Sequence, residues 1–303
     1  MNTNSTNTVD YDLSQYPLWT ALVTPFDNND NIDFNNLKIL VQQQSSAGNG
    51  ILLLGSTGEG LALTLEEQKK IVSFVCALST NVPILVAVGG INLKAQQDWI
   101  QYCNKLPIHG YLLGSPLYAK PGTEGLIHWF NTLLDEASLP CMLYNVPGRS
   151  AVAIDPKVLS QLSNHPNLWA LKEASGDINT FESFRKAAPK LQIYSGDDAL
   201  MPYFAQAGAK GLVSVAANAW PEKTAEFVRQ SLTGIYPNLF NHWSEAIEAL
   251  FEVANPIPVK ILMKEQGRLN HAHLRPPLTE KELLNTAALS AADKTISSWN
   301  NTL

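Results

Sequence analysis

The sequence has little of what marks several common classes of protein. Its three cysteines, Cys76, Cys103 and Cys141, lie far apart and form no CxxC pair. This spacing suits neither a disulfide framework nor a zinc site, and it indicates a reducing compartment. No run of about 18 apolar residues occurs, so we expect no membrane-spanning helix. The formal net charge of −6, with no basic stripe, argues against nucleic-acid binding.

The amino-terminal residues also lack the pattern of a secretory signal peptide. Residues 1–16 are polar and rich in Asn and Thr, without a basic start followed by an apolar core. We therefore expect a flexible N-terminal arm on a cytoplasmic protein.

What the sequence does contain is a repeated alternation of strand and helix patterns. The predicted strands span residues 18–23, 50–54, 83–88, 110–113, 141–145, 168–172, 191–194 and 211–215. Asp33 and Gly48 bracket one intervening helix, and Thr64 with Glu67 forms a capping box before another. Strands that alternate with helices predict a parallel sheet. Eight such units predict a closed (β/α)8 TIM barrel over residues 17–233.

Residues 234–303 show helical patterns and no strand pattern. These patterns cover residues 240–253, 258–266 and 279–299. We interpret this part of the chain as a C-terminal helical extension of the barrel.

Lys172 ends a short apolar run that predicts a strand buried on both faces. Burial disfavours the ammonium form of a lysine, so such an amine can attack a carbonyl group. Alternatively, Lys172 pairs with an acid or extends to the surface. The neighbouring Glu173, however, points to the opposite face of the strand. We therefore interpret Lys172 as a reactive amine.

Other polar residues lie where predicted strands end, which is where barrel enzymes of this type place their active sites. The residues at these ends are Thr24, Ser56, Thr57, Tyr118, Tyr144, Lys172 and Gly196. Tyr144 ends the strand that precedes the lysine strand, so its phenol could carry protons for chemistry at the amine. The alternative for Tyr144 is a packing role with its hydroxyl bonded to a carbonyl.

Two further features suit carboxylate groups. Ser56 and Thr57, in a Gly-Ser-Thr-Gly loop, offer hydroxyls and backbone N–H groups, but the loop lacks the spacing of a nucleotide-binding motif. Arg149 follows Tyr144 closely and could bind a second carboxylate; the alternative is a surface ion pair. We expect no metal site, since Asp197 and Asp198 have no other ligands clustered with them.

Three motifs together resemble one family of enzymes. They are Gly-Ser-Thr-Gly-Glu at 55–59, Tyr-Asn-Val-Pro-Gly-Arg at 144–149, and Leu-Lys-Glu-Ala-Ser-Gly at 171–176. The chain resembles the dihydrodipicolinate synthase / N-acetylneuraminate lyase family, whose barrel enzymes form a Schiff base with pyruvate. Residues 255–260 and 274–278 look like the synthase branch.

The resemblance implies the catalytic roles. Lys172 matches the Schiff-base lysine, and Tyr144 matches the tyrosine that relays protons. Ser56 falls where synthases usually have threonine, in a hydroxyl relay with Tyr144 and a second tyrosine. Tyr118 matches that second tyrosine, which family members insert into the site of the neighbouring subunit.

It also implies the binding roles. Thr57 matches the residue that binds the pyruvate carboxylate, and Arg149 matches the arginine that receives the carboxylate of aspartate semialdehyde. Gly196 and Val213 match positions whose backbone faces bound pyruvate.

The implied reaction is condensation of pyruvate with L-aspartate 4-semialdehyde, in diaminopimelate and lysine biosynthesis. No metal or organic cofactor is implied, and the implied assembly is a homotetramer built as a dimer of dimers. The alternatives are an N-acetylneuraminate lyase or another 2-keto acid aldolase of the family, and a non-catalytic paralogue that binds a keto acid.

Two departures from the family pattern matter. Ser56 followed by threonine is also the habit of the lyase branch. Lysine-inhibited synthases carry polar and aromatic groups at the positions that match Leu65, Gln68, Gln96 and Leu117. Because two of these are leucines, we expect weak or no inhibition by lysine.

Overall fold

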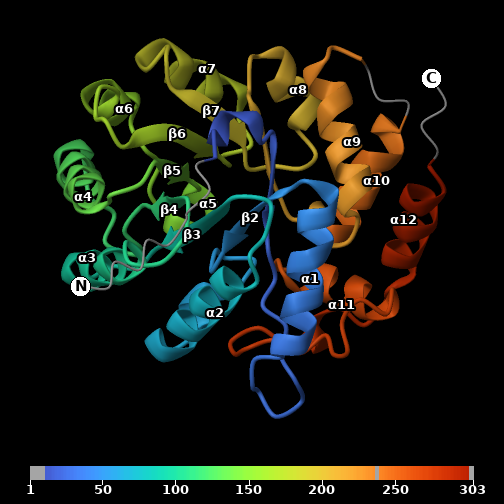
Figure 1. Cartoon of the computed structure of the whole chain (residues 1–303). Helices are drawn as coiled ribbons and strands as arrows, with labels where there is room; N and C mark the ends of the chain where they lie inside the picture. Colours follow the sequence, from blue (N-terminus) through green and yellow to red (C-terminus); the bar gives the residue numbers. More distant parts are fainter. Residues whose placement is uncertain (1–10, 236–238, 300–303) are drawn as a thin grey trace.

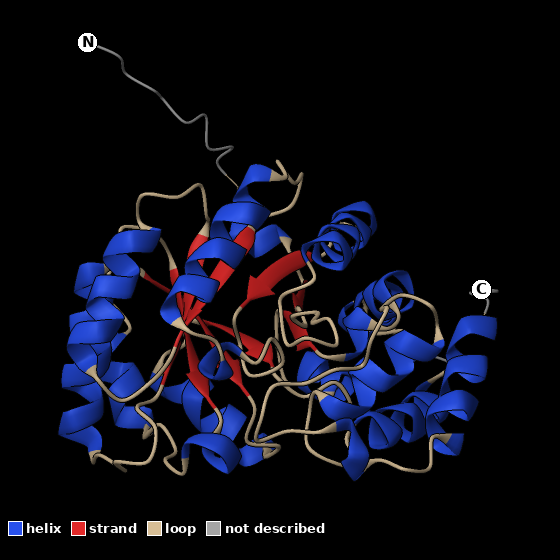
Figure 2. Ribbon diagram, turned by 90° about the horizontal axis from the view of Figure 1, so that it is seen from below, coloured by secondary structure: helices blue, strands red, loops and turns tan. Residues whose placement is uncertain are grey.

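A closed barrel of eight parallel strands forms the centre of the molecule, in a computed structural model that describes residues 11–235 and 239–299. The strands are β1 (Leu18–Ala21), β2 (Gly50–Leu53), β3 (Ile84–Val88), β4 (Gly110–Gly114), β5 (Cys141–Asn145), β6 (Leu168–Glu173), β7 (Gln192–Ser195) and β8 (Gly211–Ser214). They pair in chain order, and β8 closes on β1. Figures 1 and 2 show the strands at the centre of the molecule. The predicted (β/α)8 barrel is confirmed.

The period of two along each strand explains why both faces are apolar. One set of side chains, including Trp19, Met142 and Tyr194, packs inside the barrel. The alternate set, including Leu143 and Leu171, packs outward against the helices. Strands buried on both faces are expected in a parallel barrel.

The helices cover the outside of the barrel (Figure 2). They are α1 (Phe34–Ala47), α2 (Leu65–Ala77), α3 (Leu93–Cys103), α4 (Thr123–Glu136), α6 (Pro156–Leu162), α7 (Ile178–Ala187), α8 (Met201–Gln206) and α9 (Pro221–Leu232). The short α5 (Pro147–Ser150) instead follows β5 directly, at the carboxyl end of the barrel. The predicted caps are present: Asp33 accepts a hydrogen bond from the Asn36 N–H, Gly48 is left-handed, and Thr64 with Glu67 forms the capping box.

The C-terminal residues form α10 (Phe240–Leu250), α11 (Ile257–Glu265) and α12 (Ala287–Ser298), on the side of the barrel where α9 and α1 lie (Figure 1). The ring of Trp243 stacks on Phe227 of α9 at 4.2 Å, so extension and barrel share one apolar core. The helix predicted from residue 279 was wrong in its first part. A short 3₁₀ turn covers Glu280–Glu282, and Leu284 is 89% exposed.

The N-terminal arm was predicted to be flexible over residues 1–16, but its described part, from Tyr11 onward, is packed. From Tyr11 onward it packs against the amino end of the barrel, where Leu13 is only 5% exposed. The Tyr11 ring meets His109 edge-on at 4.8 Å. Apolar and aromatic side chains among the polar ones account for this correction, while residues 1–10 lie outside the described part. Within that part, no helix is both long and apolar enough to cross a membrane.

Candidate active site

Lys172 and Tyr144 face each other at the carboxyl ends of β6 and β5. The two residues are in register across the strand pair. The Nζ atom of Lys172 lies 4.3 Å from the centre of the Tyr144 ring, and the lysine is only 6% exposed. The predicted proximity of amine and phenol is thus confirmed, and the amine is held out of bulk water.

Gly196 makes room for the lysine side chain. A Cβ atom at this position would lie 2.8 Å from Cε of Lys172 and 2.7 Å from Cβ of Ala174. The Gly196 N–H donates to the Glu173 carbonyl at 2.6 Å, which extends the ladder beyond β7. Val213 of β8 is buried in the barrel interior. Both positions predicted to face a keto acid therefore belong to the barrel interior or its rim.

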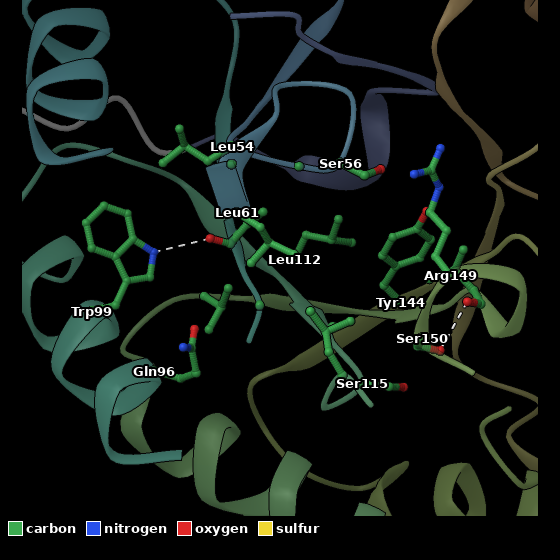
Figure 3. A pocket seen from close by; sticks show the side chains of 18 of the residues that line it. Leu54, Ser56, Leu61, Gln96, Trp99, Leu112, Ser115, Tyr144, Arg149 and Ser150 are labelled. Carbon is green, nitrogen blue, oxygen red and sulfur yellow. Dashed lines mark hydrogen bonds between the residues drawn. The ribbon is translucent and has the colours of Figure 1, made fainter. Parts of the chain in front are cut away.

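A cavity of about 300 Å³ opens beside the phenol. Ser56, Tyr144 and Arg149 line one part of it, and Gln96 and Trp99 line another (Figure 3). Ser56 and Tyr144 thus border the same cavity.

Thr57 and Arg149 both contact Asn255, a residue of the C-terminal extension. The Nδ2 of Asn255 donates to Thr57 Oγ1 at 3.0 Å, and its carbonyl accepts from Arg149 Nη2 at 3.4 Å. Thr57 is buried, whereas Arg149 is exposed on α5. The two predicted carboxylate-binding residues are therefore linked through one residue, whose contacts we did not predict.

Tyr118 is not brought to the other predicted residues. It follows β4, has a left-handed backbone with φ of 69°, and is 90% exposed. Its neighbour Leu117 lines the cavity. Within one chain, the site therefore contains the amine, one phenol and the hydroxyl loop, while the second phenol projects outward.

An ion pair between extension and barrel also escaped prediction. Lys260 of α11 is fully buried, bonds to the carboxylate of Glu59, and donates to the His273 carbonyl at 2.9 Å. Burial lowers the pKa of Lys260 to about 8. The other oxygen of Glu59 accepts from the Arg275 N–H at 2.8 Å. This contact holds the loop that carries Ser56, and a lysine in an apolar helical run was its signal in the sequence.

Asp198, one of the two acids that follow β7, is held by hydrogen bonds from β8 and the residue after it. Asp198 accepts hydrogen bonds from the Ser214 hydroxyl and, at 2.9 Å, from the Val215 N–H. Burial raises its pKa to about 6. In residues 11–235 and 239–299, no group of three or more His, Cys, Asp or Glu residues is arranged to hold a metal ion.

This arrangement suits capture of a keto acid. A buried amine can attack a keto carbon, and the phenol beside it can exchange the protons that imine formation requires. Hydroxyls and a guanidinium at the edge of the cavity can bind carboxylates.

Comparisons with known proteins agree with this chemistry. A model of the Dihydrodipicolinate synthetase family matches residues 16–296. The chain is 47% identical over 285 residues to the 4-hydroxy-tetrahydrodipicolinate synthase of Francisella philomiragia, covering 93% of this chain and 96% of the relative. It is 43% identical over 283 residues to the enzyme of the same name from Wolbachia pipientis, with the same coverage of both chains. The crystal structure of a dihydrodipicolinate synthase from Bacillus anthracis superposes with a TM-score of 0.84 at 30% identity, covering 94% of this chain and 98% of the other.

Proposed function

The chain belongs to the dihydrodipicolinate synthetase family, and we propose that it condenses pyruvate with L-aspartate 4-semialdehyde through an imine on Lys172. The activity is that of a 4-hydroxy-tetrahydrodipicolinate synthase, a Schiff-base-forming lyase of diaminopimelate and lysine biosynthesis. The observation that carries the assignment of Lys172 is its buried Nζ, 4.3 Å from the ring centre of Tyr144.

The first half of the reaction takes place at the amine. Nζ of Lys172 attacks the keto carbon of pyruvate, and loss of water leaves the imine. Tyr144 carries the protons for addition and dehydration, with Ser56 as the next hydroxyl of the relay. Thr57 binds the pyruvate carboxylate, because a hydroxyl whose Oγ1 accepts from Asn255 can still donate its own proton. Backbone groups of Gly196 and Val213 face the keto acid.

The second half forms a carbon–carbon bond. Loss of a methyl proton converts the imine to an enamine, which attacks the aldehyde carbon of aspartate semialdehyde. Arg149 receives the carboxylate of this substrate, a pairing that a guanidinium fork makes with two hydrogen bonds. The amine of the substrate then displaces Lys172 from the imine, closes the ring, and releases product with the free lysine restored.

Borohydride reduction tests the assignment. The protein treated with pyruvate and borohydride should gain a covalent adduct, located on Lys172 by mass spectrometry of peptides. A coupled assay with aspartate semialdehyde should then show turnover. An adduct absent from Lys172, or full activity in the Lys172→Ala variant, would contradict the mechanism.

The exposed Tyr118 supports a proposal about the oligomeric state. We propose that its side chain completes the site of a neighbouring subunit, since it is 90% exposed and held in a left-handed conformation. The minimum active unit is then a dimer, and two dimers form the tetramer. Mixing inactive Tyr118→Ala with inactive Lys172→Ala subunits should restore activity, because one site of each mixed dimer is complete. No recovery in mixed dimers confirmed by mass would contradict the proposal.

We also place the protein in the cytoplasm. The three cysteines Cys76, Cys103 and Cys141 are free, as a reducing compartment would keep them. Burial raises the pKa of each thiol, which makes them poor nucleophiles. Fractionation of cells of the source organism tests this placement.

A further inference from the structure

Directly behind the amine and the phenol, an amide and a carboxylate join the same two strands. Asn145 follows Tyr144 on β5, Glu173 follows Lys172 on β6, and the two pairs are in consecutive register. Because side chains alternate along a strand, Asn145 and Glu173 lie on the outer face of the barrel wall. Their side chains meet there, with Asn145 Nδ2 donating to Glu173 Oε2 at 2.7 Å, and neither residue is exposed.

The hydrogen bonds at both ends of this pair fix its orientation. Asn145 Oδ1 accepts from the Ile154 N–H at 2.9 Å, and Glu173 Oε1 accepts from the Ser175 N–H at 2.6 Å. A backbone N–H only donates and a carboxylate only accepts, so the amide group of Asn145 has one satisfied orientation. The result is a continuous chain of three hydrogen bonds from Ile154 to Ser175.

This chain of hydrogen bonds connects the segments that carry the reacting groups. The bond to Ile154 closes the loop that holds α5 and Arg149. The bond to Ser175 closes the turn after the lysine strand. The Glu173 carbonyl accepts from the Gly196 N–H at 2.6 Å, which adds the end of β7.

A carboxylate is an expensive way to join two strands. The partners of Glu173 are the Asn145 amide and the backbone N–H and hydroxyl of Ser175, none of them charged, and burial raises the pKa of the acid. Apolar side chains of similar size would hold the strands together without the cost of desolvating an acid. They would not, however, hold the two loops at a fixed hydrogen-bonding distance, because apolar contacts have no direction.

We propose that Asn145 and Glu173 form a positioning pair that sets the spacing of Lys172 and Tyr144 and orients the Arg149 loop. The proposal rests on the proposed function, since it assigns these residues a role in imine formation and in binding of the second substrate. Neither residue touches the reacting atoms, so each acts through its neighbour in the chain.

Exchanging the two functional groups gives a specific test. Each single variant loses the central hydrogen bond. In Glu173→Gln, the glutamine N–H group faces the N–H group of Asn145, and in Asn145→Asp, two carboxylates face each other. In the double variant Asn145→Asp/Glu173→Gln, the glutamine donates to the aspartate, and both outer bonds to backbone N–H groups remain possible. The double variant therefore restores all three bonds with the central one reversed.

The measured quantities are the rate of borohydride-trapped imine formation with pyruvate and KM for aspartate semialdehyde, well below the Tm of each variant. Each single variant should lose about 10- to 100-fold in imine rate, as expected when reacting groups are displaced by up to about 1 Å. The double variant should recover to within a few-fold of the unmodified protein. Glu136→Gln, which alters the amide–carboxylate contact to Gln101 at 2.8 Å on the outer surface, is the matched control and should leave the rate unchanged.

The outcomes separate positioning from plain stability. Folded single variants with a lower Tm but an unchanged imine rate would overturn the proposal, as would a double variant as slow as the single ones. If neither single variant folds, the imine rate of the double variant decides, and a loss of more than about tenfold contradicts the role. Amide hydrogen exchange of Ile154 and Ser175 is a readout independent of chemistry. It should be faster in the single variants and restored in the double one, so the pair can be judged even if the unmodified protein forms no imine and the proposed function fails.

Discussion

The two ends of the barrel are built from different kinds of contact. At the amino end, the Trp19 ring lies 5.9 Å from that of Trp169, which lies 5.5 Å from Tyr194. Leu13 packs against the same group from outside the strands. This end is an apolar plug in which large rings exclude water.

At the carboxyl end, directional contacts replace ring packing. Lys172 faces a phenol, and Thr57 is held by the Asn255 amide at 3.0 Å. Glu59 is paired with the buried Lys260 of the extension. Hydrogen bonds and ion pairs specify positions that apolar contacts leave adjustable.

The contrast between the two ends separates residues that stabilise the fold from residues that support activity. In (β/α)8 barrels, catalytic groups lie at the carboxyl ends of the strands, and residues that contribute to stability lie at the opposite end. Substitutions at the two ends should therefore change different measured quantities.

The largest effect should come from the amine itself. Lys172→Ala removes the only group proposed to bond covalently to substrate, and kcat should fall by roughly 10⁴-fold or more. The Tm should change little, because Lys172 makes no ion pair within residues 11–235 and 239–299 and loses only its contact with the Tyr144 ring. Steady-state assays and calorimetry measure the two quantities. Lys157→Ala, at an exposed site of α6, is the control, and a kcat loss below tenfold in Lys172→Ala would break the comparison.

At the amino end the opposite result is expected. Trp19 is fully buried, and its ring fills the space that a Cβ on Gly50 would enter, at 2.4 Å. Trp19→Ala should lower the free energy of unfolding by about 3–5 kcal/mol, through lost burial and the cavity left behind. Urea unfolding gives this value, while kcat per folded site should stay within about twofold. A loss of kcat in fully folded protein would show that the apolar plug at the amino end also positions groups at the carboxyl-end opening of the barrel, the mouth.

Substitution of Arg149, which lines the cavity, tests binding of the second substrate. Arg149→Ala should lower kcat/KM for aspartate semialdehyde by about 10²-fold, because a charge-assisted contact to the carboxylate is lost. Imine formation with pyruvate should be unaffected. Arg149→Lys should recover only part of the loss, since an ammonium cannot make the paired hydrogen bonds. Arg185→Ala on α7 is the control for loss of a positive charge. If Arg149→Ala reduced activity equally towards both substrates, the substitution would have changed the site as a whole.

A smaller effect concerns the acid sensitivity of the contact between α2 and the C-terminal extension. Hydrogen bonds from Arg275 lower the pKa of Glu67, at the start of α2, to about 2, and the nearer contact to Nη2 is 2.6 Å. The folded pKa lies below the ordinary value of 4.5, so this stabilisation is present above pH 4.5 and lost as the pH falls towards 2. At pH 6, Glu67→Gln should cost about 1–3 kcal/mol, allowing for partial solvent screening.

Urea unfolding at several pH values measures this effect. The difference between Glu67→Gln and the unmodified protein should shrink as the pH falls below 4.5. Glu66→Gln, at the exposed neighbouring position, should show little difference at any pH. A difference independent of pH would mean that Glu67 acts through packing and not through its charge.

The same contrast explains what could be predicted from the sequence. The strands, the helix caps and the proximity of Lys172 and Tyr144 followed from local periodicity and from the rule that strand ends converge. The contacts of Asn255 with Thr57 and of Lys260 with Glu59 join residues about 200 positions apart. No local pattern encodes such a contact, because it depends on how the extension packs on the barrel.

The smallest expected effect is inhibition by lysine, because not every position near the carboxyl end of the barrel offers polar groups. Of the two leucines at the positions in question, Leu117 lines the cavity, and Leu65, the first residue of α2, is 51% exposed. Gln68 is already engaged, donating to the Gly60 carbonyl at 2.8 Å. Leucine side chains cannot satisfy the charged ends of an amino acid, so desolvating lysine there would cost free energy without compensation.

Lysine at low millimolar concentration should therefore change the initial rate by less than about twofold and leave the Tm unshifted, since a ligand that does not bind cannot stabilise. Initial rates and thermal denaturation over a lysine titration measure this, with norleucine as the control. Abolition of activity by lysine alone would show that other groups of the mouth bind its charges.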